Sequence, residues 1–332
     1  MKKQRILSGM RPTGALHLGN YMGALENWVR LQESYECFFG VVDWHSLTTD
    51  YADPVAIRES VLEVATDWLA AGLEPSRSTL FIQSLVPQHA ELHLLLSMIV
   101  PVPWLERVPT YKEQQQQLQE KDLSTYGFLG YPLLQTADII VYKADAVPVG
   151  EDQAPHIELA REIVRRFNNL YGSVFPEPQT LHTEAKRIPG TDGRKMSKSY
   201  GNAIYMKDEP ETVRQKLRPM VTDPARKRRT DPGNPDVCPV FDLHRAFSPE
   251  ATREWAAAGC RSAGIGCLDC KAKLAEHVLE RLLGIHARRP ELAKRPDTVW
   301  DVLVEGSRRA REVAEATLEE VRVAMKIGYP RS

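Results

Sequence analysis

The sequence predicts an α/β protein in which a doubly wound parallel sheet is followed by a purely helical region. In residues 1–205, short apolar runs alternate with stretches of helical periodicity, and this alternation is typical of a parallel sheet covered by helices. Beyond residue 205 the strand-like runs end, and only amphipathic helical patterns follow. We therefore expect one domain over residues 1–205 and a second, helical domain over residues 206–332.

Four apolar runs predict the strands of the sheet. The run CFFGVVDWH at 37–45 is too apolar for a surface strand, so it should be buried. The run AVPVGED at 146–152 is a short apolar strand that leads into an acidic turn. The other two are RILSGM at 5–10, which enters a glycine-containing loop, and TLFIQS at 79–84.

Helical patterns separate and follow these runs. The first begins at Leu18, where apolar residues start to recur at helical spacing. The second follows Asp53 and Pro54, since proline is favoured at the first helical position, and it should end at Gly72. The later helices are expected within residues 131–143, 153–172, 207–223, 271–295 and 298–328.

Two further segments are predicted to be exposed helices. The segment HAELH at 89–93 resembles a zinc-protease motif, but that motif needs glutamate directly after the first histidine, and here Ala90 stands there. We therefore interpret it as a surface helix. The glutamine-rich segment at 112–120 is interpreted in the same way.

Composition sets limits on the partners of the chain. The formal net charge is −1 over 332 residues, so any polyanion must be bound by a local basic patch. No stretch approaches the ~20 apolar residues of a membrane span. The N-terminus also lacks the apolar run of a secretory signal. We expect a cytoplasmic protein without membrane contact, in which the five cysteines do not form a disulfide framework.

The loop GALHLGN at 14–20 is nearly a phosphate-binding loop. Gly14 and Gly19 have the spacing of a P-loop, but Asn20 and Tyr21 stand where lysine and serine or threonine are needed. If this loop holds phosphates, their cations must come from another part of the chain. The segment GTDGRKMSKSYGN at 190–202 offers two lysines among glycines, which allow a loop to close. The alternative is a solvated basic loop.

The two segments together resemble the signature motifs of the class I aminoacyl-tRNA synthetases. TGALHLGN is similar to their His-x-Gly-His motif, and KMSKS at 195–199 is identical to their second motif. This resemblance implies that the nucleotide lies at a strand-to-helix turn and that the mobile second motif brings the lysines to its phosphates. It also implies a catalytic set of His17, Asn20, Lys195, Ser197 and Lys198.

A finer resemblance covers nearly the whole chain. SGMRPTGALHLGNYMGAL, YPLLQTADIIVYKADAVPVGEDQ and HIELAREIVRRFN are similar to the tryptophanyl-tRNA synthetases of the bacterial type. That family implies a Rossmann-like catalytic domain, activation of tryptophan by ATP, transfer to tRNA(Trp) and a homodimer. Two alternatives remain open, a tyrosyl-tRNA synthetase and an idle paralogue that only binds tRNA.

The resemblance also implies the ATP site, with Mg²⁺ bridging phosphate oxygens. Residues of the first motif should contact ATP, an acidic turn should hold the ribose and the ammonium group, and one apolar residue should lie against adenine. The implied set is Arg11, Pro12, Thr13, Gly19, Asn20, Gly150, Glu151, Asp152, Ile188, Lys195, Met196, Ser197, Lys198 and Ser199.

The amino-acid pocket is implied to centre on Asp138. Indole offers one N–H donor and no acceptor, so a buried carboxylate would satisfy it. Asp138 lies in the middle of a predicted helix, between Ala137 and Ile139, and it matches the family residue with this role. Around it, the resemblance implies that Tyr131, Gln135 and Gln153 line the pocket. Its implied walls are Leu7, His45, Val147 and Val149, for which plain core packing is the alternative.

Four of the five cysteines gather in the helical region. Cys238, Cys260, Cys267 and Cys270 have the spacing C-x21-C-x6-C-x2-C, and four thiolates suit zinc or an iron–sulfur cluster. Chance clustering of buried cysteines is the alternative. A similar pattern in a subset of the bacterial family implies a [4Fe–4S] cluster that organises the tRNA-binding region. Two arginine-rich segments, at 224–232 and 286–295, are expected to be helical and are candidates for contact with tRNA phosphates, the alternative being solvated surface.

Overall fold

The computed structural model describes residues 3–109, 111, 122–150, 153–182 and 188–329. Its centre is a five-stranded parallel sheet with the order β3-β2-β1-β4-β5. The strands are β1 (Arg5–Met10), β2 (Glu36–Val41), β3 (Ser78–Ile82), β4 (Ala146–Val149) and β5 (Gln179–His182). The chain leaves β1 toward β2 on one side and later places β4 on the other. The crevice at the carboxyl ends of β1 and β4 is therefore the expected ligand position in such a sheet.

Two neighbouring phenylalanines in β2 show how both faces of the sheet are covered. Successive strand residues point to opposite faces. Phe39 stacks on Trp28 at 4.6 Å between ring centroids, on the face covered by α2 (Glu26–Leu31) and α4 (Ile57–Ala71). Phe38 stacks on Tyr142 at 4.6 Å, in the separate core formed with α5 (Gln88–Ser97), α8 (Tyr126–Ile140) and α9 (Ala154–Tyr171). These two cores confirm the predicted doubly wound sheet.

The helix expected from Leu18 begins there but is not regular. A short α1 (Leu18–Asn20) passes into a π-helical turn, η1 (Tyr21–Leu25), before α2 continues. Isolated π-helical turns inside helices are frequent at functional sites. The helix expected after Pro54 begins only at Ile57, and it ends at Gly72, whose φ of 112° forms a left-handed C-cap.

Several expectations need correction. The run 37–45 is a strand only to Val41, because α3 (Asp43–Asp50) begins just after it. Residues 224–232 form turns rather than a helix. The segment 89–93 does not form a simple surface helix, since His89 in α5 is completely buried. The glutamine-rich segment 112–120 lies outside the described residues.

The remaining elements are short connections and the helices of the second half. They are η2 (Gln83–Leu85), α6 (Val102–Glu106), α10 (Pro210–Leu217), η4 (Pro235–Val237), α11 (Pro239–Phe247), α12 (Glu250–Arg261), α13 (Cys267–Ala293) and α14 (Pro296–Ala324).

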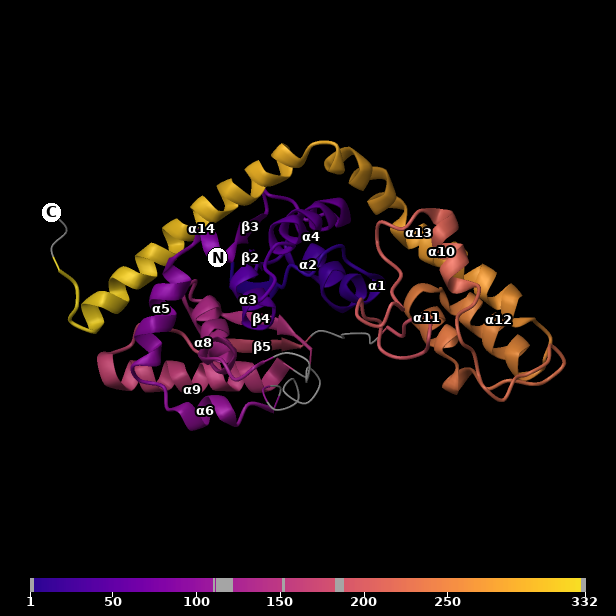
Figure 1. Cartoon of the computed structure of the whole chain (residues 1–332), viewed down its shortest axis with the longest axis horizontal. Coiled ribbons are helices and arrows are strands. Elements are labelled where there is room, and N and C mark those ends of the chain that lie inside the picture. Colours follow the sequence, from indigo (N-terminus) through magenta and orange to yellow (C-terminus); the bar gives the residue numbers. More distant parts are fainter. Residues whose placement is uncertain (1–2, 110, 112–121, 151–152, 183–187, 330–332) are drawn as a thin grey trace.

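The second half is helical, as the sequence predicts, but its last helix returns to the sheet. Helices α10 to α12 gather at one end with the start of α13, and α14 runs back along the sheet region (Figure 1). Gly306 of α14 lies so close to β3 that a Cβ atom there would be 1.8 Å from the Leu80 carbonyl oxygen. Ser307 Oγ accepts a hydrogen bond from Ile82 N at 3.0 Å. The domain boundary after residue 205 stays a prediction.

No helix in the described part of the chain combines the length and apolar character needed to cross a membrane.

Candidate active site

The first signature motif forms the turn between β1 and α1. His17 is the N-cap of α1, where its Nδ1 accepts a hydrogen bond from Asn20 N at 3.2 Å. In return, Asn20 Oδ1 accepts from His17 N at 3.1 Å. Burial, together with the charges of Lys198 and Lys195, lowers the pKa of His17 to about 4. The imidazole is therefore neutral near pH 7, and its proton is on Nε2 because Nδ1 is an acceptor.

The second signature motif packs directly on the first. Lys198 Nζ donates to the carbonyl oxygens of Thr13 and Gly14, both at 2.8 Å, and to Thr13 Oγ1 at 3.2 Å. Just beyond the motif, Met206 N donates to Leu16 O at 2.9 Å. Burial lowers the pKa of Lys198 to about 8. The structure thus brings together the glycine turn and a lysine from the distant second motif.

The second motif is shaped from within by Asn202, which the sequence reasoning missed. Asn202 is 2% exposed, and its Oδ1 accepts from Ser197 N at 2.8 Å. Its Nδ2 donates to Asp192 Oδ1 at 2.7 Å and to Lys195 O at 3.2 Å. A buried amide with this many partners holds the loop in one shape. The sequence signal that could have indicated this role is the position of Asn202, three residues after KMSKS.

The other predicted ATP-site residues surround these motifs. Met196 and Ile188 are buried and joined by a hydrogen bond between Met196 N and Ile188 O at 3.1 Å. Ser199 Oγ lies 2.9 Å from Ser197 Oγ. Pro12 and Thr13 line a separate hollow beside α3. Two predicted residues, Glu151 and Asp152, fall outside the described residues.

A pocket of about 390 Å³ opens at the carboxyl ends of β1, β2 and β4. Its volume is within the usual range for a small-molecule site. The structure brings every predicted amino-acid pocket residue into its lining: Leu7, His45, Tyr131, Gln135, Asp138, Val147, Val149 and Gln153. The predicted ATP-site residues Arg11 and Gly150 also line it. Asn27 of α2 extends the lining toward the first motif and was not predicted.

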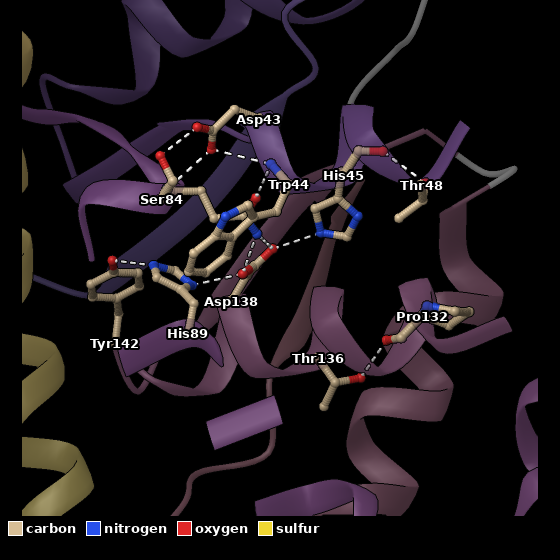
Figure 2. A network of polar contacts seen from close by, with 11 residues as sticks. Asp43, Trp44, His45, Thr48, Ser84, His89, Pro132, Thr136, Asp138 and Tyr142 are labelled. Carbon is tan, nitrogen blue, oxygen red and sulfur yellow. Dashed lines mark hydrogen bonds and ion pairs between the residues drawn. The ribbon is translucent and has the colours of Figure 1, made fainter. Parts of the chain in front are cut away.

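Asp138 of α8 is the buried charge of this pocket. Its side chain is 5% exposed, and Figure 2 shows His45 and His89 approaching it from different sides. His45 Nε2 lies 2.8 Å from Oδ2, and His89 Nδ1 lies 2.6 Å from Oδ1. Gln83 Nε2 donates to both oxygens at 2.8 and 2.9 Å. Burial alone would raise the pKa of Asp138, but His89 and His45 together lower it below its usual range.

The carboxylate is therefore ionised, and its partners are oriented in turn. His89 Nε2 lies 2.7 Å from the Tyr142 hydroxyl, which stays protonated because burial raises its pKa. His89 donates from Nδ1 to Asp138, because an ionised carboxylate can only accept. Gln83 Oε1 accepts from Trp44 N at 3.2 Å. These contacts aim three donors at one carboxylate.

Gln83 and His89 are the main residues that sequence reasoning missed at this site. Gln83 lies near the end of the predicted strand 79–84, and in the structure it comes directly after β3, where a polar side chain reaches the carboxyl edge of a parallel sheet. His89 shares the buried face of α5 with Leu92 and Leu96, at helical spacing. Reading that face as buried would have placed His89 inside the protein.

The four clustered cysteines come from adjoining parts of the helical region. Cys238 precedes α11, Cys260 lies in α12, and Cys267 and Cys270 lie in the first turn of α13. All four are free thiols. Burial, and after it the charges of the three neighbouring cysteines, raises the pKa of Cys270 to about 12. Nevertheless, within the described ranges no three histidine, cysteine or acidic side chains are arranged to hold a metal ion. The structure therefore does not support the predicted cluster.

The two arginine-rich segments differ in where their side chains lie. Lys227, Arg228 and Arg229 are exposed in the turns of 224–232. In the other segment, Arg288 Nε donates to Ala70 O at 2.7 Å, and Arg289 pairs with carboxylates of α4. Arg289 in particular is engaged by the protein itself rather than presented to a polyanion.

Comparison with known proteins agrees with this geometry. The family model for tRNA synthetases class I (W and Y) matches residues 1–283. A tryptophan–tRNA ligase of Thermotoga maritima is 54% identical over 98% of this chain and 100% of the relative. One from Ralstonia nicotianae is 48% identical over 99% of this chain and 100% of the relative.

A solved structure shares the whole fold. The tryptophanyl-tRNA synthetase of Campylobacter jejuni, complexed with ADP and tryptophan, superposes with a TM-score of 0.86 at 30% sequence identity. The match covers 97% of this chain and 100% of that one. Signature motifs that meet at the β1–α1 turn, full-length relatives and the matching family model lead to one conclusion. This chain belongs to the class I tRNA synthetases of the tryptophan and tyrosine family.

Proposed function

We propose that this chain is a tryptophan–tRNA ligase. It activates tryptophan with ATP to give tryptophanyl-adenylate and pyrophosphate, and then transfers tryptophan to tRNA(Trp). The observation that carries the proposal is the ionised, buried Asp138 in the wall of the 390 Å³ pocket. The full-length relatives, which are tryptophan–tRNA ligases, support the same assignment.

The chemistry of the pocket favours tryptophan over tyrosine. Indole presents a single N–H donor, whereas the tyrosine hydroxyl both donates and accepts. Asp138 is an acceptor when ionised, and its other neighbours Gln83, His45 and His89 already direct donors toward it. Gln83 Nε2 bridges both oxygens, so only three donor groups face a carboxylate that has about four acceptor sites, and an indole N–H is a suitable fourth donor group. The full-length relatives described above are tryptophan–tRNA ligases and give the tyrosyl alternative no comparable support.

The activation step needs positioning and charge rather than a protein nucleophile. A carboxylate oxygen of tryptophan attacks the α-phosphorus of ATP, and the bond from that phosphorus to the pyrophosphate oxygen breaks. Lys195, Ser197 and Lys198 would bind the departing pyrophosphate as negative charge develops on it. Neutral His17 can donate from Nε2 to a phosphate oxygen without adding a fixed charge.

The metal ion of this step would be carried by the nucleotide. The motif segments RPTGALHLGN and KMSKS contain no carboxylate, the ligand type that binds Mg²⁺ in proteins. Phosphate oxygens of ATP would therefore hold Mg²⁺ and neutralise part of their charge. In the same scheme Gly150, Glu151 and Asp152 hold the ribose and the ammonium group, Arg11, Gly19 and Asn20 contact ATP, and Ile188 lies against adenine.

Pyrophosphate exchange tests the assignment directly. Purified protein with ATP and labelled pyrophosphate should form labelled ATP when tryptophan is added, and should form far less with tyrosine. Charging of tRNA(Trp) should follow under the same conditions. Exchange with tyrosine alone would establish the tyrosyl alternative, and tRNA binding without any exchange would establish the idle paralogue.

We also propose a metal site at Cys238, Cys260, Cys267 and Cys270, with a [4Fe–4S] cluster as the first candidate and zinc as the second. What supports it is that adjoining parts of α11, α12 and α13 bring the four thiols together, and thiolates are the ligands of both groups. Burial and the neighbouring cysteines raise the pKa of Cys260 and Cys270. The side chains do not form a ligand set as they stand. No step of the reaction is therefore assigned to a metal here.

Protein purified without oxygen should settle the nature of this site. A cluster predicts brown protein with about four irons per chain, since each cysteine would bind one iron of a [4Fe–4S] unit. The matched control is Cys37→Ser, which removes the cysteine in β2 and should leave the metal content unchanged. Colourless protein with one zinc would rule out the cluster, and folded protein with four free thiols and no metal would rule out both.

The remaining proposals concern assembly and location. Residues 206–332 would form the domain that contacts tRNA, with Lys227, Arg228 and Arg229 as exposed cations for its phosphates. A homodimer is supported by exposed apolar side chains on α5, α6 and the start of α8, and the mass of the protein in solution tests it. These side chains are Leu94, Met98, Val102 and Tyr126. The chain would act in the cytoplasm, where its proposed tRNA substrate is found.

A further inference from the structure

Arg289 connects the helical region to the sheet region through two carboxylates. It lies in α13, its side chain is only 12% exposed, and it reaches across to α4. Its Nε donates to Asp67 Oδ1 at 2.6 Å, and its Nη2 donates to Glu63 Oε2 at 2.8 Å. Such a planar donor pair holds its acceptors in a defined orientation.

Asp67 carries this contact into the first signature motif. The residue is completely buried, and its second oxygen, Oδ2, accepts a hydrogen bond from Leu16 N at 2.7 Å. Leu16 immediately precedes His17, the N-cap of α1. One carboxylate therefore joins a helix of the second half to the backbone of the ATP-binding turn.

Glu63 carries the contact to the segment after the second motif. Its Oε2 accepts from Lys207 Nζ at 3.0 Å. The preceding residue, Met206, donates from its backbone N–H to Leu16 O at 2.9 Å. The N–H and the carbonyl of Leu16 are thus both held, one by Asp67 and the other by the chain that leaves KMSKS. Arg289 therefore contacts Leu16 indirectly in two ways, through Asp67 and through Glu63 and Lys207.

The same carboxylates act on the second motif through charge. Lys198 Nζ rests on the carbonyl oxygens of Thr13 and Gly14. The negative charges of Asp67 and Glu63 oppose the effect of burial on the Lys198 pKa. Arg289 pairs with both carboxylates, and its positive charge offsets part of their negative charge.

We propose that Arg289 and Asp67 are positioning residues for the ATP site, through which the placement of α13 sets the geometry of both signature motifs. The inference rests on the proposed function, since it concerns the use of ATP in tryptophan activation. A purely structural ion pair would affect stability alone. A positioning role affects kcat/KM for ATP and leaves the tryptophan pocket unchanged, because neither residue lines that pocket.

Arg289→Met is the first test. The substitution keeps an unbranched apolar chain but removes both donors, so Asp67 is left buried without its cation. We expect roughly a tenfold or larger fall in kcat/KM for ATP in pyrophosphate exchange, the scale of losing one charged hydrogen bond. The dissociation constant of tryptophan, measured without ATP, should stay within about twofold of wild type on the same reasoning.

The matched control is Arg288→Met. Arg288 neighbours Arg289 on α13 and also contacts α4, but its Nε donates only to Ala70 O and does not reach a motif. Melting temperatures of both variants separate stability from positioning. Arg289→Lys should recover part of the loss, because an ammonium keeps the charge but not the two-pronged geometry.

The outcomes separate the two hypotheses. If wild-type protein catalyses exchange and Arg289→Met matches Arg288→Met in kcat/KM for ATP, the positioning role is wrong. An equal loss of tryptophan affinity would also overturn it, since that would reflect general disorder. If the wild-type protein shows no tryptophan-dependent exchange, the proposed function fails instead. Asp67→Asn, which keeps an acceptor for Leu16 N, should reproduce the Arg289→Met profile if it folds.

Discussion

Replacing Lys195 or Lys198 with alanine should lower kcat for tryptophan activation by roughly 10²-fold or more, the scale of losing one preorganised charge at a reacting group. The developing pyrophosphate charge has no other cation in the two motif segments than these lysines and Arg11. Tryptophan binding measured without ATP should change little, because neither lysine lines the pocket. Wild-type exchange kinetics in either variant would remove the role assigned to that lysine.

A control and a pH profile sharpen this test. Lys273 is a partly exposed lysine of α13 that pairs with Glu276 one turn away, so Lys273→Ala removes a charge outside both motifs and should leave kcat unchanged. Burial lowers the pKa of Lys198 to about 8, so this ammonium is charged below that pH and neutral above it. In wild-type protein kcat/KM for ATP should therefore fall as the pH rises through about 8. Lys198→Ala should flatten this part of the profile.

The strands show what the sequence could predict about the fold. The first four strands were predicted because each contains a short apolar run. The run is most continuous in β2 and β3, which are almost wholly buried. The edge strand β5 was missed because Gln179–His182 is partly exposed and carries polar residues at both ends. Periodicity likewise predicted α13 but not that Arg289 would face α4, because a charged residue on a helix gives no sign of its partner.

The candidate site, like the fold, could be predicted only in part from the sequence. Asp138 could be identified because a carboxylate in the middle of an apolar helix needs an explanation. Gln83 and His89 could not, since they lie 55 and 49 residues away in sequence. His45, 93 residues away, was named as a pocket residue by the family resemblance, but not as a partner of Asp138. Only the order of the strands brings the end of β3, α3 and α5 to one side of α8. A network that joins four separate elements leaves no local pattern.

Asp138→Asn should lower kcat/KM for tryptophan by a factor that corresponds to about 1–3 kcal/mol of lost transition-state stabilisation, the cost of a mismatched buried hydrogen-bonding group. Asparagine has nearly the same shape, but it loses the charge and turns one acceptor into a donor. That NH₂ group would face donors from Gln83, His45 or His89, whichever oxygen it replaces. The indole N–H would then compete with these side chains for a single carbonyl oxygen.

Selectivity separates this effect from general damage to the pocket. The variant should be compared on tryptophan and on an analogue in which sulfur replaces the indole N–H. Wild-type protein should strongly prefer tryptophan, because the analogue leaves a buried carboxylate short of a partner. In Asp138→Asn that preference should shrink.

The matched control is Asp43→Asn: Asp43 accepts from Trp44 N and Ser84 N near the same network but does not line the pocket. Its substitution should leave the tryptophan-to-analogue ratio as in wild type, and an unchanged ratio in Asp138→Asn would mean that Asp138 does not bind the indole.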